Sequence, residues 1–129
     1  MLSPDGQWLA YHSDEAGRYE IYVQRFSDGS GKRRVSTNGG VAPQWRGDGR
    51  ELYYQDLGNR LMAVPMTGGT SLAFGAPVAL VEYPYSGNPE IPNYSVDRAG
   101  QRFLLTATVE TAANLPLTIV VNWTAGTKK

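Results

Sequence analysis

Short β-rich runs bounded by Gly, Asn, Asp and Pro make up the hydrophobic pattern of the chain, and no stretch shows a sustained helical period. Runs of this length and composition predict strands. We expect strands, in chain order, over residues 7–13, 19–26, 32–36, 42–45, 51–55, 61–66, 77–82, 93–96, 102–109 and 117–123. Residues 84–92 contain three prolines and predict a long connection.

Two of these runs, 8–11 and 117–121, are almost continuously apolar rather than alternating between apolar and polar positions. A strand with this pattern has both of its faces covered. The pattern therefore favours sheets stacked against other sheets over a single sheet with one face in water.

A turn followed by an apolar run recurs along the chain. Gly6 and Gly49 follow Asp in the first two copies, and Gly100 marks a degenerate third copy, at spacings of 43 and 51 residues. Such spacing is typical of β-propeller blades, each a four-stranded antiparallel sheet. We expect an all-β chain with repeats of about 1–40, 41–88 and 89–129. Trp45 and Tyr94 precede their glycines by four and six residues, so both should point to the same face of their blades.

The expected strands do not fill three blades. The first repeat lacks an innermost strand, because only Met1 and Leu2 precede its turn, and the third lacks an outermost strand. The chain then contains about two and a half to three blades and has two apolar sheet faces, one at each end, that no other sheet covers. We expect self-association, in which two copies close a six-bladed ring.

The first repeat, Ser3-Pro4-Asp5-Gly6-Gln7-Trp8-Leu9-Ala10-Tyr11 followed by Glu20-Ile21-Tyr22-Val23, closely resembles the TolB-type, WD40-like (PD40) propeller repeat. The end of the chain, from Asn93-Tyr94 to Trp123, resembles the last blades of large bacterial propeller proteins, some of which carry a serine/threonine kinase. The resemblance implies a propeller of six or more blades used for protein contacts.

The chain departs from the family pattern in three ways. It spans about half a ring, Gly47 replaces the proline of the second turn, and Ala99 replaces the aspartate of the third. It also contains no Gly-rich kinase loop, no His-Arg-Asp and no Asp-Phe-Gly, so kinase activity does not carry over to it.

Charge and composition narrow the partners. Twelve basic and twelve acidic residues give net charge +0, which disfavours nucleic acid as a partner. Lys32-Arg33-Arg34 is the one basic block, and we interpret it as the solvated edge of an outer strand rather than a phosphate site. The absence of cysteine, of a leader and of an apolar span leaves the compartment, cytoplasm or periplasm, open. The abrupt start at Met1 suggests a fragment.

Candidate chemistry is sparse. His12 is the one histidine, and on a strand between Tyr11 and Ser13 it is expected to be a packed residue. Asp14-Glu15 beside Gly17 lacks the spacing of a calcium loop and predicts a polar turn. Gly39-Gly40 and Gly68-Gly69 lack the lysine and helix of a phosphate loop and also predict turns. We therefore expect no catalytic, cofactor-binding or metal-binding residue.

The aromatic residues recur at repeat positions, which favours a core between blades over a ligand site. They are Trp8, Tyr22, Trp45, Tyr53, Tyr54, Tyr94 and Trp123. Propellers most often bind at the mouth of the central tunnel, and Gln44, Asn93 and Ser95 are placed to line it here.

These features favour a non-catalytic module for protein interaction or scaffolding. Two alternatives stay open. One is an accessory or regulatory part of a larger enzyme, a serine/threonine kinase or a peptidase, which an upstream kinase or hydrolase domain would favour. The other is a propeller that binds a small ligand such as a sugar or a peptide.

Overall fold

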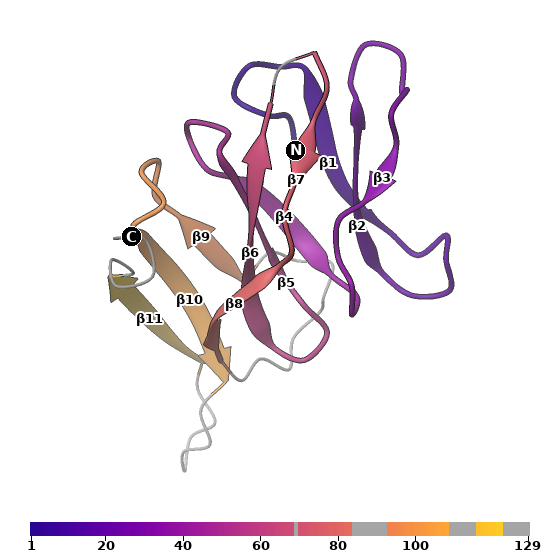
Figure 1. Ribbon diagram of the computed structural model, residues 1–129. Helices are drawn as coiled ribbons and strands as arrows, with labels where there is room; N and C mark the ends of the chain where they lie inside the picture. The colour runs from indigo at the N-terminus through magenta and orange to yellow at the C-terminus, as the bar shows by residue number, and fades with distance from the viewer. Residues whose placement is uncertain (69, 84–92, 109–115, 123–129) are drawn as a thin grey trace.

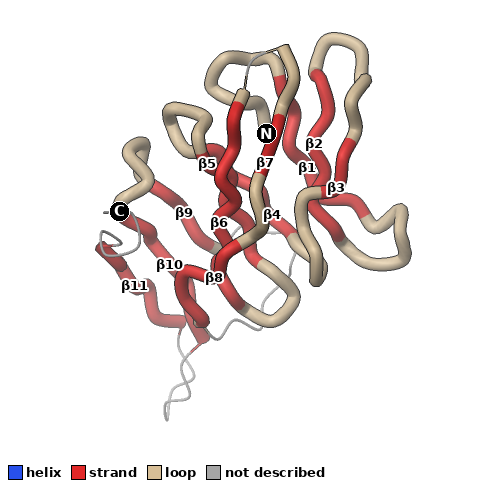
Figure 2. The backbone as a smooth tube through the Cα atoms, in the orientation of Figure 1, coloured by secondary structure: helices blue, strands red, loops and turns tan. Residues whose placement is uncertain are grey.

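The computed structural model describes residues 1–68, 70–83, 93–108 and 116–122, and within them it contains eleven strands and no helix. The strands form three antiparallel sheets that lie side by side (Figures 1 and 2). The first sheet contains β1 (Trp8–Ser13), β2 (Glu20–Arg25) and β3 (Arg33–Arg34). The middle sheet contains β4 (Val41–Trp45), β5 (Glu51–Gln55), β6 (Arg60–Thr67), β7 (Ala73–Phe74) and β8 (Val78–Glu82). The third contains β9 (Tyr94–Val96), β10 (Arg102–Thr108) and β11 (Pro116–Asn122).

All ten predicted strands are present, with ends that differ by at most a few residues. The prediction missed β7, which is too short to have a pattern of its own. Both β7 and β8 pair with β6, so together they form one outer strand in two pieces. Between the pieces, the Gly75 amide donates to the Pro65 carbonyl at 3.0 Å, while Pro77 has no amide hydrogen to continue the ladder.

The middle sheet is thus a complete blade of four strand positions, the outermost of which is filled by β7 and β8. The first sheet is not complete. At the inner edge of the first sheet, only an isolated bridge joins Leu2 to Leu9. The Ser3 amide donates to the Trp8 carbonyl at 2.8 Å, and the Ala10 amide donates to the Met1 carbonyl at 2.9 Å. These bonds are the start of an innermost strand. The third sheet has three strands in the described part of the chain.

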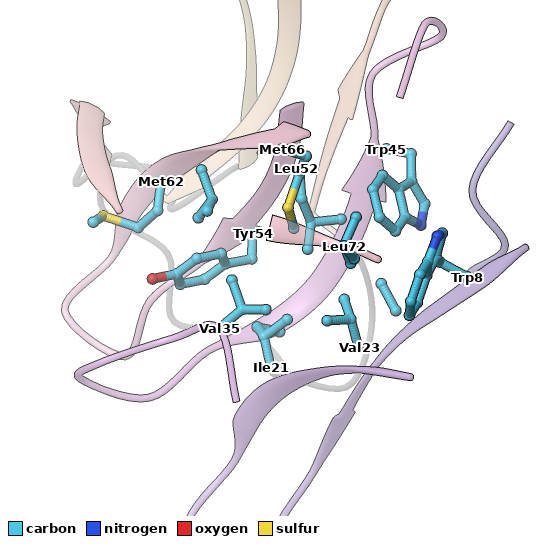
Figure 3. Packing of buried hydrophobic residues seen from close by; sticks show 12 residues of the cluster. Trp8, Ile21, Val23, Val35, Trp45, Leu52, Tyr54, Met62, Met66 and Leu72 are labelled. Carbon is cyan, nitrogen blue, oxygen red and sulfur yellow. The ribbon is translucent and has the colours of Figure 1, made fainter. Parts of the chain in front are cut away.

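Two apolar cores separate the three sheets. Core A, between the first and middle sheets, consists of Trp8, Ala10, Ile21, Val23, Val35, Trp45, Leu52, Tyr54, Met62, Val64, Met66 and Leu72, most of which Figure 3 labels. Core B, between the middle and third sheets, consists of Val41, Ala42, Tyr53, Leu61, Ala63, Tyr83, Tyr94, Phe103 and Leu105.

Strand β6 shows why both cores are needed. Met62, Val64 and Met66 belong to core A, while Leu61 and Ala63, which alternate with them, belong to core B. Side chains along a strand point alternately to opposite faces, so a nearly continuous apolar run is buried only when both faces are covered. The predicted stacking of sheets is confirmed. Trp45 of β4 lies in core A and Tyr94 of β9 in core B, so each faces the preceding sheet, as the spacing to the turns predicts.

Two of the three departures from the family pattern, at Gly47 and Ala99, have structural reasons. The Gly47 amide donates to the Arg98 carbonyl at 3.0 Å, a bond that proline could not form, and a Cβ on Gly47 would lie 2.5 Å from that carbonyl oxygen. In the third turn, Asp97 takes over the role of the missing aspartate. Its carboxylate accepts from the Gln101 amide at 2.8 Å, as Asp48 accepts from the Arg50 amide at 2.9 Å in the second turn.

Candidate functional site

A cleft of about 720 Å³ opens between the first and middle sheets, where the two Asp-Gly turns approach each other. Its volume lies within the range of small-ligand sites, roughly 300 to 1,000 Å³. The turns contribute Ser3, Pro4, Asp5, Asp48, Gly49 and Arg50, and core A and the end of β6 contribute Trp8, Trp45, Met66, Thr67, Gly68 and Leu72. The cleft therefore has a charged rim above an apolar wall.

The rim charges are held by their own turns. One Asp5 oxygen accepts from the Ser3 hydroxyl at 2.6 Å and from the Gln7 amide at 3.1 Å. The hydrogen bond from Ser3 lowers the pKa of Asp5, so this carboxylate is ionised at neutral pH. Asp48 accepts from the Arg50 amide. The Arg50 guanidinium is exposed and forms no ion pair within the described residues.

Two tryptophans form the wall. Trp8 is 5% exposed and Trp45 is 6% exposed. The Trp45 indole N–H donates to the Met1 carbonyl at 3.0 Å, but the buried indole N–H of Trp8 has no acceptor among the described residues. Figure 3 shows the nitrogen end of the Trp8 ring turned toward Trp45. On the Trp8 ring, the Arg25 guanidinium carbon lies 4.8 Å from the centroid.

Two of the three residues predicted to line a tunnel mouth are engaged in contacts within the fold. Gln44 donates its side-chain amide to the Tyr94 carbonyl at 2.8 Å and so ties the middle sheet to the third. Asn93 is buried and accepts from the Tyr83 hydroxyl at 2.7 Å. Ser95 is exposed. Two of the three are thus used to join sheets, because the inner strands lie close enough for side chains to reach across.

His12 also joins sheets. Its Nδ1 accepts from the Ala42 amide at 3.2 Å, and its ring packs edge-on against Tyr19 at 5.2 Å between centroids. Ala42 lies at the bulge in β4 with a φ of 55°, an unfavourable backbone conformation for a residue other than glycine. The bond to His12 helps to hold this bulge, which agrees with a packed histidine.

The basic block lies on β3 at the exposed outer edge of the first sheet, as interpreted from the sequence. Lys32 pairs with Glu15 and lies 4.9 Å from the centroid of Tyr22. Arg33 donates to the Leu72 carbonyl at 2.9 Å and lies over the Phe74 ring. Both cations are engaged within the chain, which does not favour a phosphate site.

The remaining motifs form turns. The Gly17 amide donates to the Asp14 carbonyl at 2.9 Å, closing the predicted polar turn. Gly39 has a φ of 78° and donates to buried Glu20, while Gly69 of the second glycine pair lies outside the described residues. No group of three or more His, Cys, Asp or Glu side chains that could hold a metal occurs in the described part.

The predicted aromatic core is largely confirmed. Trp8, Trp45 and Tyr54 belong to core A, and Tyr53 and Tyr94 to core B, whereas Trp123 lies outside the described residues.

Tyr22 differs from these residues because it lies on the outer face of the first sheet. It is buried there, at 7% exposed, because it stacks on Tyr11 at 5.8 Å between centroids and lies under Lys32. This outer face also carries Leu2, which is 43% exposed. On the third sheet, Leu104 points away from core B and is 45% exposed. The two end sheets therefore each have one face that no other described sheet covers.

The cleft is not among the features that the sequence predicts. Its signal was present in the pairing of an Asp-Gly turn with a tryptophan in each of the first two repeats, but that pairing was interpreted only as turn and core.

Among the described residues, no helix long and apolar enough to cross a membrane is found.

Comparison with known proteins supports the fold. No family model matches the chain, and no curated protein matches it at a significant level. Among solved structures, it is similar to TolB from Acinetobacter baumannii, with a TM-score of 0.64 at 18% identity over 94% of this chain and 28% of that one. It is similar to a putative TolB from Agrobacterium tumefaciens, with a TM-score of 0.61 at 16% identity over 94% of this chain and 43% of that one.

A third similar structure is an oligogalacturonate lyase from Vibrio parahaemolyticus, with a TM-score of 0.60 at 14% identity over 84% of this chain and 27% of that one. The chain thus spans less than half the length of each of these structures. At these identities the similarity establishes the fold alone. Together with the three stacked sheets, it shows that the chain has the fold of consecutive blades of a TolB-like β-propeller.

Proposed function

We propose that the chain is a non-catalytic interaction module, a section of a TolB-like propeller that acts through its protein contacts. The observation that carries the proposal is the contrast between its sheets. The middle sheet packs against another sheet on each of its faces, whereas the first and third sheets each pack against one described sheet. Exposed apolar side chains on a sheet face mark a surface for another protein layer.

The two open faces are suited to each other in a ring. In a propeller each sheet packs on the next one around a central axis. The outer face of the first sheet could therefore pack on the outer face of a third sheet in the way that neighbouring blades pack on each other. Two copies related by a twofold axis would bring each first sheet against the partner's third sheet. Six blades would then close, and no apolar sheet face would remain in water.

In a longer protein, further blades of the same polypeptide would take the place of the second copy. The chain spans 27% to 43% of the structures that it resembles, which favours this arrangement as the alternative. The module would then be an accessory part of a larger protein, and any enzymatic activity would reside in other segments.

Sedimentation equilibrium of the 129-residue chain tests the proposal. We expect a dimer, and we expect Leu104→Glu to convert it to a folded monomer because the charge would lie in the contact between sheets. Val78→Glu is the matched control, since Val78 is 58% exposed but lies on β8 of the middle sheet, away from both open faces. A well-folded monomer of the unchanged chain, with the dispersed spectrum of a native protein, would contradict the proposal.

A further inference from the structure

We propose that the cleft between the first and middle sheets binds a lysine or arginine side chain of a protein partner. This inference rests on the proposed interaction function and names the chemistry of one contact. It concerns a different surface from the open sheet faces, so the two proposals can fail separately.

The apolar wall fits the aliphatic part of such a side chain. Trp8, Trp45, Met66 and Leu72 line the cleft and are each at most 6% exposed, so the wall is firmly packed. Lysine and arginine bury their methylene groups along apolar surface while the charged end stays at the rim. A saccharide would instead need the open face of an aromatic ring, and these two rings are almost wholly buried.

The rim supplies the opposite charge. The lining residues include two carboxylates, Asp5 and Asp48, and one guanidinium, Arg50, so the formal charge of the rim is −1. Behind the rim, Arg46 lies 3.4 Å from Asp48 Oδ1 and also pairs with Glu51, and these two further charges cancel. In Asp5 and Asp48, the oxygen that holds the turn is Oδ1. Each Oδ2 is left without a hydrogen bond among the described residues and can accept one from an ammonium or guanidinium group.

A free donor on the rim favours a peptide over a simple amine. The Arg50 guanidinium is exposed and has no ion pair in the described part of the chain, whereas the Trp8 N–H is turned toward Trp45 (Figure 3) and is too buried to reach a ligand. A peptide brings backbone carbonyl groups, which accept from donors of this kind, whereas an alkylamine brings none.

Tryptophan fluorescence provides the test, because Trp8 and Trp45 lie in the wall. The probes are capped pentapeptides of glycine and serine that differ in one central residue: lysine, arginine, norleucine or glutamate. We expect saturable quenching with the lysine and arginine peptides at millimolar concentration, weakened by salt. We expect about fivefold weaker binding of the norleucine peptide, because it keeps the stem but lacks the charge.

The variant Asp5→Asn/Asp48→Asn removes both negative charges of the rim, which leaves the positive charge of Arg50, and keeps the Oδ1 acceptors of both turns. We expect its affinity for the lysine peptide to fall about fivefold. Asp28→Asn is the matched control, because Asp28 also holds an Asp-Gly turn, accepting from the Ser30 amide at 3.0 Å, but lies outside the cleft. Circular dichroism and thermal melting confirm that each variant is folded.

Leu104→Glu separates the two proposals, since it alters an open sheet face and leaves the cleft intact. We expect it to bind the lysine peptide as the unchanged chain does, whatever its state of association. Equal binding of the norleucine and lysine peptides would overturn the proposal. So would unchanged binding by the folded double variant, absence of quenching by the lysine peptide, or saturable quenching by a neutral disaccharide in its place.

Discussion

Core A and core B share the strands β4, β5 and β6 but hold their sheets together by different chemistry. Core A consists mainly of aliphatic side chains, methionines and two tryptophans, and its contacts are those of close packing. Core B contains three tyrosines whose hydroxyls have partners. Tyr83 donates to Asn93 at 2.7 Å, and Tyr94 donates to the Ala42 carbonyl at 2.5 Å.

The difference teaches what each interface can tolerate. Packing contacts are non-directional, so core A loses stability in proportion to the apolar volume that is removed. Hydrogen bonds of buried hydroxyls are directional and leave an unsatisfied partner when they are broken. Core B should therefore fix the angle between its sheets more narrowly, while core A leaves room at its edge for the cleft.

The largest effect is expected from Leu52→Ala in core A. Leu52 is fully buried, so the change leaves a cavity and should lower the free energy of unfolding by about 2 to 5 kcal/mol. Chemical denaturation measures this loss. The control is Leu104→Ala on an open face. There we expect the free energy of unfolding of the monomer to fall by less than about 1 kcal/mol. Equal losses would mean that Leu104 is as well covered as Leu52.

A smaller effect is expected where the second and third turns meet. Gly47→Ala would place a methyl group 2.4 Å from the Arg98 side chain and 2.5 Å from its carbonyl oxygen, so the turns must separate. We expect a loss of about 1 to 3 kcal/mol in thermal or chemical unfolding. At Gly68 an added Cβ meets no atom within 4 Å, so Gly68→Ala should be nearly neutral. A neutral Gly47→Ala would show that this contact does not hold the sheets.

Removing single hydroxyls is expected to have an effect of similar size in core B and the smallest effect of all in core A. Tyr94→Phe leaves the buried Ala42 carbonyl without its partner and should cost about 1 to 3 kcal/mol. Tyr54→Phe in core A should cost less than about 0.5 kcal/mol, since its hydroxyl forms no hydrogen bond among the described residues.

Burial raises the pKa of Tyr54 to about 12 and raises the pKa of Tyr94, so both hydroxyls are protonated at neutral pH, where the pair is compared. Similar losses in the two variants would erase the distinction between the two cores.

The strands and their faces could be predicted from local pattern. The run Glu51–Gln55 was predicted to the residue, and the positions of Trp45 and Tyr94 relative to their glycines correctly placed both on the same face of their blades. These features depend on the two-residue period of a strand and on turn residues a few positions away. The break between β7 and β8 had no such signal, because pairing with β6 alone makes a two-residue segment a strand.

The sites depend on contacts that local pattern does not contain. The roles of Gln44, Asn93 and His12 follow from partners in the neighbouring sheet or beyond the next loop, such as Tyr94 for Gln44 and Ala42 for His12. In the same way, Asp5 and Asp48 meet at one cleft only because two sheets pack at a particular angle.

By itself, the sequence determined that this is an all-β chain of repeated antiparallel sheets stacked on one another, because hydrophobic pattern and turn chemistry are local properties. Only the tertiary structure decided that core B is held by tyrosine hydroxyls, that Gly47 must lie against Arg98, and that a charged cleft opens beside core A. These features arise from how far apart and at what angle the sheets pack, which depends on all the side chains between them at once.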